Sequence, residues 1–362
     1  MRTRFVLIFS LALMFGLAAL PVEAQFKDGS QSTALKLPLL SQAATVTQGI
    51  GLSDVTIVYH RPKVGGRVVW GTQVPYDLVW RAGANQNTTI SFSSPVTIEG
   101  QALAAGTYGL HMIPAKDGPW TVIFSKNSTS WGSFSYDKAE DALRVQVTPH
   151  AGESTEDLTY MFSGISQDSA TAELRWEKLA VPFRIGADTK EIAIAAIQQQ
   201  LRNTGGFTWD GFNDAAKYAL ENNVHLDQAV KWNEQSIQAE ERFENLGTKA
   251  DLLEAMGKTD DAKVARQKAM DKGTAFQVHV YGRGLMLNGR KAEAAVIFRA
   301  NAKKFPDVWI THGGLARTYC AEGNFDEAVK EAGLAVAGAP EAQRPPLEAL
   351  KARLAKKEDI NR

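Results

Sequence analysis

The spacing of hydrophobic residues changes once along the chain, near residue 186. Before that point apolar and polar residues alternate, which is the period of a β-strand with one buried face. Leu143, Val145 and Val147, for example, fall on one face, and the polar residues between them fall on the other. After that point apolar residues recur every three or four positions, which is the period of an amphipathic helix. The chain is therefore predicted to be multidomain, with an all-β part followed by an all-α part.

The N-terminal part has the pattern of an antiparallel β-sandwich or barrel. Its apolar runs are short, rich in β-branched and aromatic residues, and bounded by Gly, Pro, Asp or Ser. Asp117-Gly118 lies between two of these runs and is the strongest hairpin signal in the chain. No helical segment separates the runs, which favours antiparallel pairing. The predicted strands are 54–60, 88–92, 107–113, 120–124, 143–147, 158–162 and 171–176.

A series of helical hairpins is predicted after residue 186. Asp188 and Glu191 form a capping-box pattern at the start of the first helix. Later units share an apolar helix end, a glycine turn and a helix of small residues. The turn glycines Gly257, Gly289 and Gly323 recur at nearly equal intervals. Such intervals, of about 34 residues, are typical of tetratricopeptide (TPR) arrays, in which neighbouring units stack to bury their faces.

The units match the TPR motif to different degrees, and we expect three to four hairpins. The segment 215–232 resembles a degenerate early unit, with His225 at the place of the turn glycine. The glycines within 282–289 are assigned to close helix packing. The second clear unit matches through Gly282, Gly289, Ala294, Phe298 and Pro306. The third unit matches more closely, through Leu315, Ala316, Tyr319, Gly323, Ala328 and Pro340.

The N-terminus has the layout of a secretory signal peptide. A basic leader precedes a long apolar run, and small residues at Val22 and Ala24 suit cleavage before Gln25. A retained membrane anchor is the alternative, because the apolar run is near the minimum length for spanning. The resulting domain prediction is a signal peptide at 1–24, a β-sandwich domain at 25–185 and a TPR-like domain at 186–362.

Charge and composition narrow the location and the partners. The chain has 40 basic and 40 acidic residues, so it has no broad cationic field for a phosphate backbone, and nucleic acid is not expected as a partner. No apolar stretch beyond the predicted signal peptide is long enough to cross a bilayer. The prediction is a soluble exported protein, periplasmic or extracellular.

Motifs for catalysis or metal binding are missing from the sequence. The six histidines lie too far apart in sequence to form a local metal-binding pair, and no nucleophile elbow or phosphate-binding loop occurs. Cys320 is the only cysteine, so no intrachain disulfide is possible. Its place on an apolar helical stripe suggests a buried small hydrophobe. We therefore predict no cofactor, no metal and no assigned catalytic residue.

Polar and aromatic residues concentrate in the β-part and form the candidate ligand site. Arginine offers a fork of donors suited to carboxylate or phosphate, and aromatic rings suit sugars or peptide side chains. The same residues can instead brace loops and fill a core. His111 alternates with Leu110 and Met112, so it is expected on the solvent face of its strand. The candidate ligand-binding residues are Tyr59, Arg61, Arg67, Trp80, Arg81, Asn85, Tyr108 and His111, with Trp70 and Tyr76 beside them.

The β-part also resembles a known family. The segments "YHRPKVGGRVVWGTQVPYDLVWRAGANQNTTISF", "LAAGTYGLHMIPAKDGPWTVIFSK" and "WGSFSYD" are similar to the exported bacterial domain of unknown function 2911. The similarity spans about residues 35–185. It implies an envelope location and a frequent pairing with TPR-like tails, and it implies no activity and no catalytic residue.

Two functions from different classes fit these patterns. The first is a non-catalytic scaffold that binds a protein or peptide through the helical array, and a small anionic or glycan ligand through the β-domain. The second is a hydrolase or isomerase acting on a glycan or small carboxylate. In that alternative the arginines orient the anion and His111 carries a proton. A purely structural role for the β-domain is the third possibility.

Overall fold

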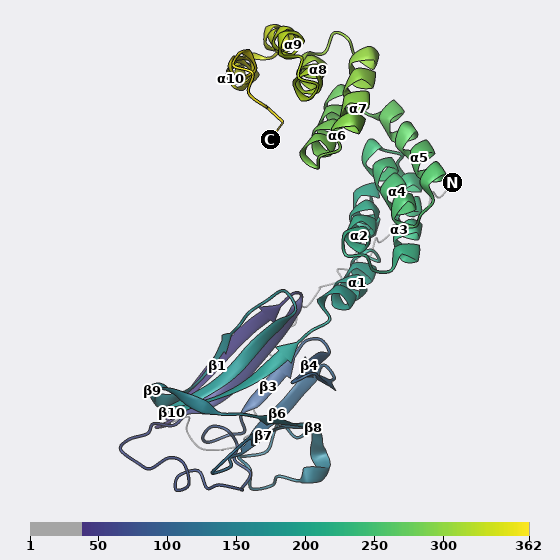
Figure 1. The fold of residues 1–362 in the computed structure, drawn as a ribbon. Helices are drawn as coiled ribbons and strands as arrows, with labels where there is room; N and C mark the ends of the chain where they lie inside the picture. Colours follow the sequence, from purple (N-terminus) through teal and green to yellow (C-terminus); the bar gives the residue numbers. More distant parts are fainter. Residues whose placement is uncertain (1–37, 362) are drawn as a thin grey trace, which may run out of the picture. The chain divides into compact units, whose positions relative to one another are not determined.

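The computed structural model describes residues 38–361, and the predicted signal peptide at 1–24 lies outside them. The chain divides into two compact units between Thr189 and Lys190. The first unit is built from antiparallel strands and the second from helices (Figure 1). The expected architecture, all-β followed by all-α, is confirmed.

Residues 38–361 contain ten strands in two antiparallel sheets. The six-stranded sheet has the order β1-β2-β3-β6-β7-β8, and the four-stranded sheet has the order β5-β4-β10-β9. The strands of the first sheet are β1 (Gln42–Ile50), β2 (Ser53–Arg61), β3 (Thr89–Phe92), β6 (Gly106–Ile113), β7 (Trp120–Ser125) and β8 (Asp141–Val147). Those of the second are β4 (Val96–Ile98), β5 (Gln101–Leu103), β9 (His150–Ser163) and β10 (Ser169–Gly186).

All seven predicted strands are present, and three more were not predicted. Strand β1 was missed because it is an edge strand with few large apolar residues, and most of its side chains are exposed or half-exposed. Strands β4 and β5 are three residues long, too short to show a period. The two sheets are open, so the unit is sandwich-like and not a closed barrel.

Aromatic side chains fill the space between the sheets. Phe124 of β7 meets Phe183 of β10 with ring centroids 5.9 Å apart. The ring of Trp70 packs edge-on against three other tryptophans, at 5.8 Å from Trp80, 5.0 Å from Trp120 and 5.7 Å from Trp176. Such edge-to-face pairs add to the large apolar area that each ring buries. These tryptophans therefore anchor the loop 62–88 to the core.

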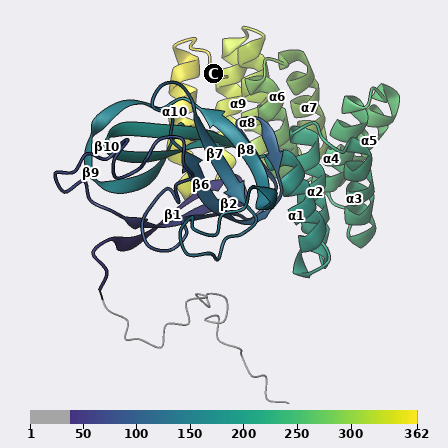
Figure 2. The same cartoon turned by 90° about the horizontal axis from the view of Figure 1, so that it is seen from below.

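The helical unit consists of one leading helix, four hairpins and a closing helix (Figure 2). Helix α1 spans Thr189–Gln200 and α10 spans Arg344–Ala355. No helix within residues 38–361 is long and apolar enough to cross a membrane. The hairpins are α2 (Trp209–Glu221) with α3 (Leu226–Ala239), α4 (Phe243–Ala255) with α5 (Thr259–Lys272), α6 (Ala275–Leu287) with α7 (Lys291–Lys304), and α8 (Trp309–Ala321) with α9 (Phe325–Gly338).

The four hairpins are copies of one unit. The first helix of every hairpin has 13 residues and the second has 14. The turn glycines Gly257, Gly289 and Gly323 all have left-handed φ angles between 76° and 79°, which end the first helix at low steric cost. The predicted repeat is thus confirmed at the upper end of the expected three to four hairpins.

The turn of the first hairpin corrects one prediction. Asn223, and not His225, occupies the place of the turn glycine, because it is the second residue after α2 and has a φ of 51°. Asparagine tolerates this conformation better than most residues with a side chain. His225 is also left-handed, with a φ of 47°, and immediately precedes α3. The turn therefore has one residue more than the others.

Close helix packing depends on two glycines that face one phenylalanine. Phe298 of α7 is fully buried. A Cβ atom on Gly282 would lie 2.7 Å from its ring, and one on Gly314 would lie 2.5 Å from it. The packing role assigned to the glycines of 282–289 is confirmed for Gly282 only. Gly284 has open space at its Cβ position, and Gly289 serves the turn.

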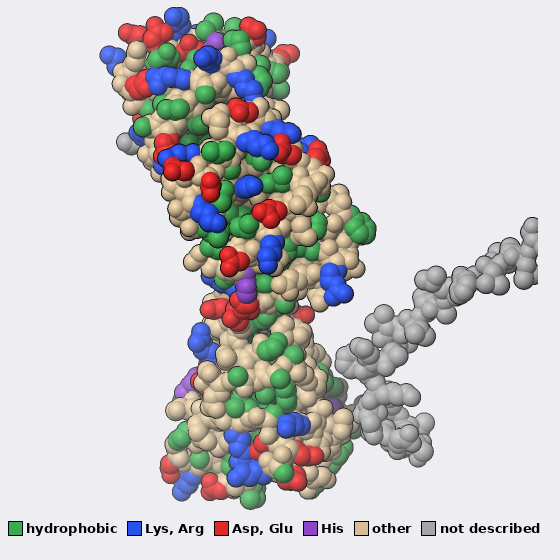
Figure 3. Space-filling view, turned by 90° about the vertical axis from the view of Figure 1, so that its right-hand side faces the viewer, with side chains coloured by type: hydrophobic (Ala, Val, Ile, Leu, Met, Phe, Trp, Pro, Cys, Tyr) green, Lys and Arg blue, Asp and Glu red, His purple; other side chains and the backbone are tan. Residues whose placement is uncertain are grey.

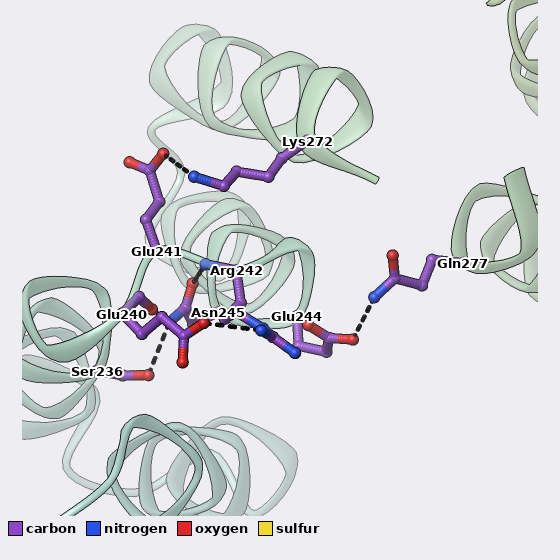
Figure 4. Close-up of polar contacts among 8 residues, drawn as sticks. All are labelled: Ser236, Glu240, Glu241, Arg242, Glu244, Asn245, Lys272 and Gln277. Atoms are coloured by element: carbon purple, nitrogen blue, oxygen red, sulfur yellow. Dashed lines mark hydrogen bonds and ion pairs between the residues drawn. The ribbon is translucent and has the colours of Figure 1, made fainter. Parts of the chain in front are cut away.

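A buried asparagine joins the first two hairpins. Asn245 accepts a hydrogen bond from the backbone N–H of Arg242 at 2.9 Å and donates to Ser236 Oγ at 2.9 Å and to the Glu240 carbonyl at 2.8 Å. Figure 4 shows the contact of Asn245 with Ser236 and, farther along, Gln277 facing Glu244. Because Asn245 is fully buried, these bonds satisfy polar groups that would otherwise destabilise the interface.

Two neighbouring glycines of α6 provide a matched test of this packing. Gly282→Ala should lower the free energy of unfolding of the helical unit by about 1 kcal/mol or more, because overpacking against Phe298 outweighs the gain in helix propensity. Gly284→Ala should raise the same quantity by up to about 1 kcal/mol, because its Cβ meets nothing. Urea unfolding followed by circular dichroism measures both. Stabilisation by both substitutions would show that Phe298 yields without cost.

Candidate functional site

Two of the predicted site residues connect the sheets. Arg61, at the end of β2, donates from Nε to the Leu158 carbonyl at 3.0 Å and from Nη2 to Thr159 Oγ1 at 2.6 Å. Tyr59, also in β2, is buried, and its hydroxyl accepts a hydrogen bond from the backbone N–H of Tyr160 at 3.1 Å. Leu158, Thr159 and Tyr160 belong to β9, so both side chains hold the six-stranded sheet to the four-stranded one.

Two further predicted residues brace their own loops. Arg67 donates to the carbonyls of Val64 and Lys63 and to Gln73 Oε1. Tyr108 donates from its hydroxyl to the Ala104 carbonyl at 2.9 Å. With their donors already used inside the fold, these side chains are explained by local structure.

Residues 80–85, called the Trp-Arg loop below, are held in place by backbone hydrogen bonds. Trp80 and Met112 exchange two backbone hydrogen bonds of 2.8 Å, so Trp80 is anchored to β6. Ala82 has a φ of 51°, and its carbonyl accepts the hydroxyl of the buried Tyr160 at 2.9 Å. Asn85 has a φ of 57°, as expected for a left-handed turn residue, and donates to the Ser41 carbonyl at 3.3 Å. The backbone of this loop therefore connects the two sheets, and we call this set of contacts the lock.

The side chain of Arg81 points away from these backbone contacts and lines a pocket of about 360 Å³. It is half-buried, and Nη1 donates to the Asn85 carbonyl at 3.2 Å. Its guanidinium carbon lies 5.3 Å from the Trp131 ring centroid and 5.9 Å from that of Phe134. No carboxylate within residues 38–361 pairs with it. The pocket is lined by Gln73, Pro75, Leu78, Val79, Trp80, Arg81, Ser133 and Phe134.

His111 is buried, which corrects the prediction of a solvent-facing side chain. Only 2% of the residue is exposed. Alternation failed here because β6 is an interior strand and its residues 108–112 are all buried. His111 Nδ1 lies 3.0 Å from Ser133 Oγ, and the Tyr136 ring is 5.4 Å away. Burial lowers the pKa of His111 to about 4, although the charge of Asp141 opposes the shift.

The segment 131–144 supplies residues that sequence reasoning missed. Ser133 and Phe134 line the pocket, and Trp131 stacks on Phe134 with centroids 5.8 Å apart and planes inclined by 8°. Behind them Tyr136 donates to both oxygens of Asp141, at 2.9 and 2.8 Å, while Arg144 Nε donates to the same carboxylate at 2.5 Å. The density of aromatic residues in "WGSFSYD" was the available signal.

A second candidate surface lies on helix α6. Phe276, Val280 and Leu287 are 62%, 50% and 61% exposed and follow one another at helical spacing. Exposed apolar side chains gathered on one face usually mark an interaction surface. Arg283 lies on the same face, since it is three residues after Val280 and four before Leu287.

Two arginines at corresponding repeat positions carry positive charge beside this surface. Arg283 of α6 and Arg317 of α8 stand at the same place in successive hairpins, and neither pairs with a carboxylate within residues 38–361. Burial, together with the charges of Arg283 and Arg353, lowers the pKa of Arg317 to about 10. On the face shown in Figure 3, acidic and basic side chains are interspersed.

The remaining titratable groups within residues 38–361 form no metal site. No cluster of three or more His, Cys, Asp or Glu within residues 38–361 is arranged to hold a metal. Cys320 is buried, as predicted, and burial raises the pKa of its thiol, so it is a poor nucleophile at neutral pH.

Comparison with known proteins identifies the β-unit but no activity. Residues 41–185 match the family model described as "Protein of unknown function (DUF2911)", which confirms the resemblance seen in the sequence. No curated protein matches the chain. A solved structure described as "Crystal structure of YrrB: a TPR protein with an unusual peptide-binding site" is 18% identical, with a TM-score of 0.27, and covers 45% of this chain and 83% of its own. The repeat assignment here rests on helix lengths and turn positions.

The lock can be tested at Tyr160. Tyr160→Phe removes the buried donor to the Ala82 carbonyl and should lower the free energy of unfolding of the β-unit by about 1–2 kcal/mol. Tyr76→Phe is the matched control, because no hydrogen bond of its hydroxyl occurs within the described residues, and it should change stability little. Denaturant unfolding followed by tryptophan fluorescence measures both. Equal stability of the two variants would contradict the lock.

Burial of His111 also predicts a pH dependence. Its pKa is 6.5 when unfolded and about 4 when folded, so the unfolded state binds more protons between these pH values. Lowering the pH from 7 to 5 should therefore cost about 2 kcal/mol of stability from this residue. In His111→Gln the urea midpoint of the β-unit should fall less over the same range. Parallel falls in variant and wild type would refute the assignment.

Proposed function

We propose that this protein is a non-catalytic binding scaffold whose helical unit binds an acidic segment of a partner protein through the α6 face. The observation that carries the proposal is the exposed stripe of Phe276, Val280 and Leu287 with Arg283 among them. Repeat arrays of stacked hairpins commonly present such surfaces to partners. Export, as the N-terminal sequence pattern indicates, places this partner in the periplasm or outside the cell.

Both the apolar and the charged groups contribute to the expected preference. Covering the exposed part of each large side chain of the stripe contributes about 1–2 kcal/mol before the costs of association. Arg283 and Arg317 favour carboxylates over ammonium groups, because neither is neutralised by an acid of the described chain. A segment that combines apolar anchors with Asp or Glu fits both features.

The hydrolase or isomerase alternative has less support. It needs His111 to exchange protons with a substrate and a second group to assist it. Asp141, the acid whose charge acts on His111, already accepts hydrogen bonds from Tyr136 and Arg144. We therefore place binding before catalysis.

Binding can be measured with labelled synthetic peptides. The probe is a short fluorescein-labelled peptide in which Leu and Phe alternate with Glu, and the control peptide has Lys in place of Glu. Fluorescence anisotropy with the full chain should show saturable binding of the acidic peptide only. Arg283→Glu should weaken it by about tenfold or more, since a reversed charge costs at least about 1.4 kcal/mol. Leu287→Ser should weaken it less.

The matched control is Arg202→Glu, which changes the net charge equally at an exposed residue after α1. It should leave the affinity within about twofold of wild type. The proposal fails if Arg202→Glu and Arg283→Glu weaken binding equally, or if the Lys peptide binds as well as the Glu peptide.

A further inference from the structure

We propose that the pocket beside the Trp-Arg loop binds a small organic carboxylate that carries an apolar or aromatic group. This site lies in the β-unit and is independent of the α6 face. Arg81 contributes a guanidinium to the lining, Ser133 a hydroxyl and Phe134 an exposed ring. The Trp131 ring stacks on Phe134 and faces Arg81.

Arg81 supplies the charge that selects an anion. It is the single charged side chain in the pocket lining, and its guanidinium has no carboxylate partner within residues 38–361. Burial lowers its pKa, with no neighbouring acid that raises it. A half-buried cation without a counter-charge is costly, and a bound carboxylate relieves that cost with two parallel hydrogen bonds.

The backbone next to Arg81 is shaped around its guanidinium. Gly132 has a φ of 68°, and a Cβ atom at this position would lie 2.3 Å from Arg81 Nη1. The left-handed φ favours glycine at this position, and any side chain here would have to displace the Arg81 guanidinium. This close approach also sets Trp131 and Phe134 beside the guanidinium, where their ring faces stabilise its charge.

The exposed rings indicate that the ligand carries an apolar group beside its carboxylate. Phe134 is 81% exposed and Trp131 is 55% exposed, although the two stack on each other and lie beside Arg81. Leu78, on the pocket lining, is also largely exposed. Apolar side chains in this setting gain free energy when a ligand covers them. A carboxylate with an aromatic or branched apolar group therefore fits better than acetate.

Ser133 gives the site its second polar group. Its hydroxyl lies 3.0 Å from His111 Nδ1, and His111 is neutral near pH 7 because its pKa is about 4. In the tautomer that carries the proton on Nδ1, the histidine donates to Ser133 Oγ. The serine O–H then remains available to donate to a ligand oxygen in the pocket that Arg81 also lines. This arrangement binds a carboxylate without adding a second positive charge.

A carboxylate suits the pocket better than a phosphate. The lining offers one cation, which balances a monoanion and leaves a phosphate dianion with excess charge. Two other arginines near the site are held by the fold: Arg67 donates to Gln73 and to two backbone carbonyls, and Arg144 pairs with Asp141. The volume of about 360 Å³ is at the lower end of small-molecule sites.

The test is a titration of the full chain with phenylacetate, observed through tryptophan fluorescence and isothermal calorimetry. Trp80 lines the pocket and Trp131 faces Arg81, so occupancy should change the emission. Phenylacetamide, the neutral isostere, should bind at least tenfold more weakly, and acetate should also bind more weakly. Inorganic phosphate should not displace phenylacetate. Binding of the amide as strong as that of the acid, displacement by phosphate, or no saturable response to phenylacetate overturns the proposal.

Four variants connect the response to the pocket. Ser133→Ala and Phe134→Ala alter a pocket hydroxyl and an exposed ring, and each should weaken phenylacetate binding by about three- to tenfold while the melting temperature stays near that of wild type. Arg81→Lys keeps the charge but loses the fork, and should weaken binding by tenfold or more. Arg184→Gln removes an exposed arginine outside the pocket and should bind as wild type. Unchanged binding in Ser133→Ala and Phe134→Ala overturns the proposal, whatever the result for Arg81→Lys.

Phenylacetate binding and peptide binding can be tested independently, because they involve different residues. Arg283→Glu should bind phenylacetate as wild type does, and Phe134→Ala should bind the acidic peptide as wild type does. Either proposal can therefore fail while the other stands.

Discussion

The hydrogen bond from the buried hydroxyl of Tyr160 to the carbonyl of Ala82 is the contact on which the β-unit depends. It ties a loop of the first sheet to a strand of the second, and it holds a residue with a left-handed backbone in place. Arg81 directly precedes Ala82, so this bond helps to fix the backbone from which the Arg81 side chain extends. One loop therefore has two roles: its backbone holds the sheets together, and the guanidinium of Arg81 lines the pocket.

The helical unit is stabilised by stacking, because each hairpin alone leaves an apolar face exposed to water. Small residues allow the neighbouring helices to approach, as Gly282 and Gly314 do against the Phe298 ring. The same repetition that packs the interior also repeats the surface. Arg283 and Arg317 occupy corresponding positions of successive hairpins, and charge accumulates on one face without any local motif for binding.

Three residues show which features could be predicted from the sequence and which could not. Asn85 was expected in a left-handed turn and is found there, because that preference belongs to the residue itself. His111 was expected in solvent and is buried, because alternation reports the neighbours in the chain and not the segment 131–136 that covers the strand. His225 was assigned the role of a turn glycine that Asn223 fulfils, since the extra residue in that turn shifts the register.

By itself the sequence determined the change from strands to helices, the repeat length and the left-handed turns, since these depend on local backbone preference and on the period of apolar residues. It also identified the Trp-Arg loop as an unusual concentration of chemistry. Only the tertiary structure decided which of those residues brace the fold and which face a pocket. Whether a donor is used inside the molecule depends on partners distant in the chain, such as Leu158 for Arg61. The pairing of Ser133 with His111, the cover over Arg81 and the exposed stripe on α6 all arise from such long-range packing.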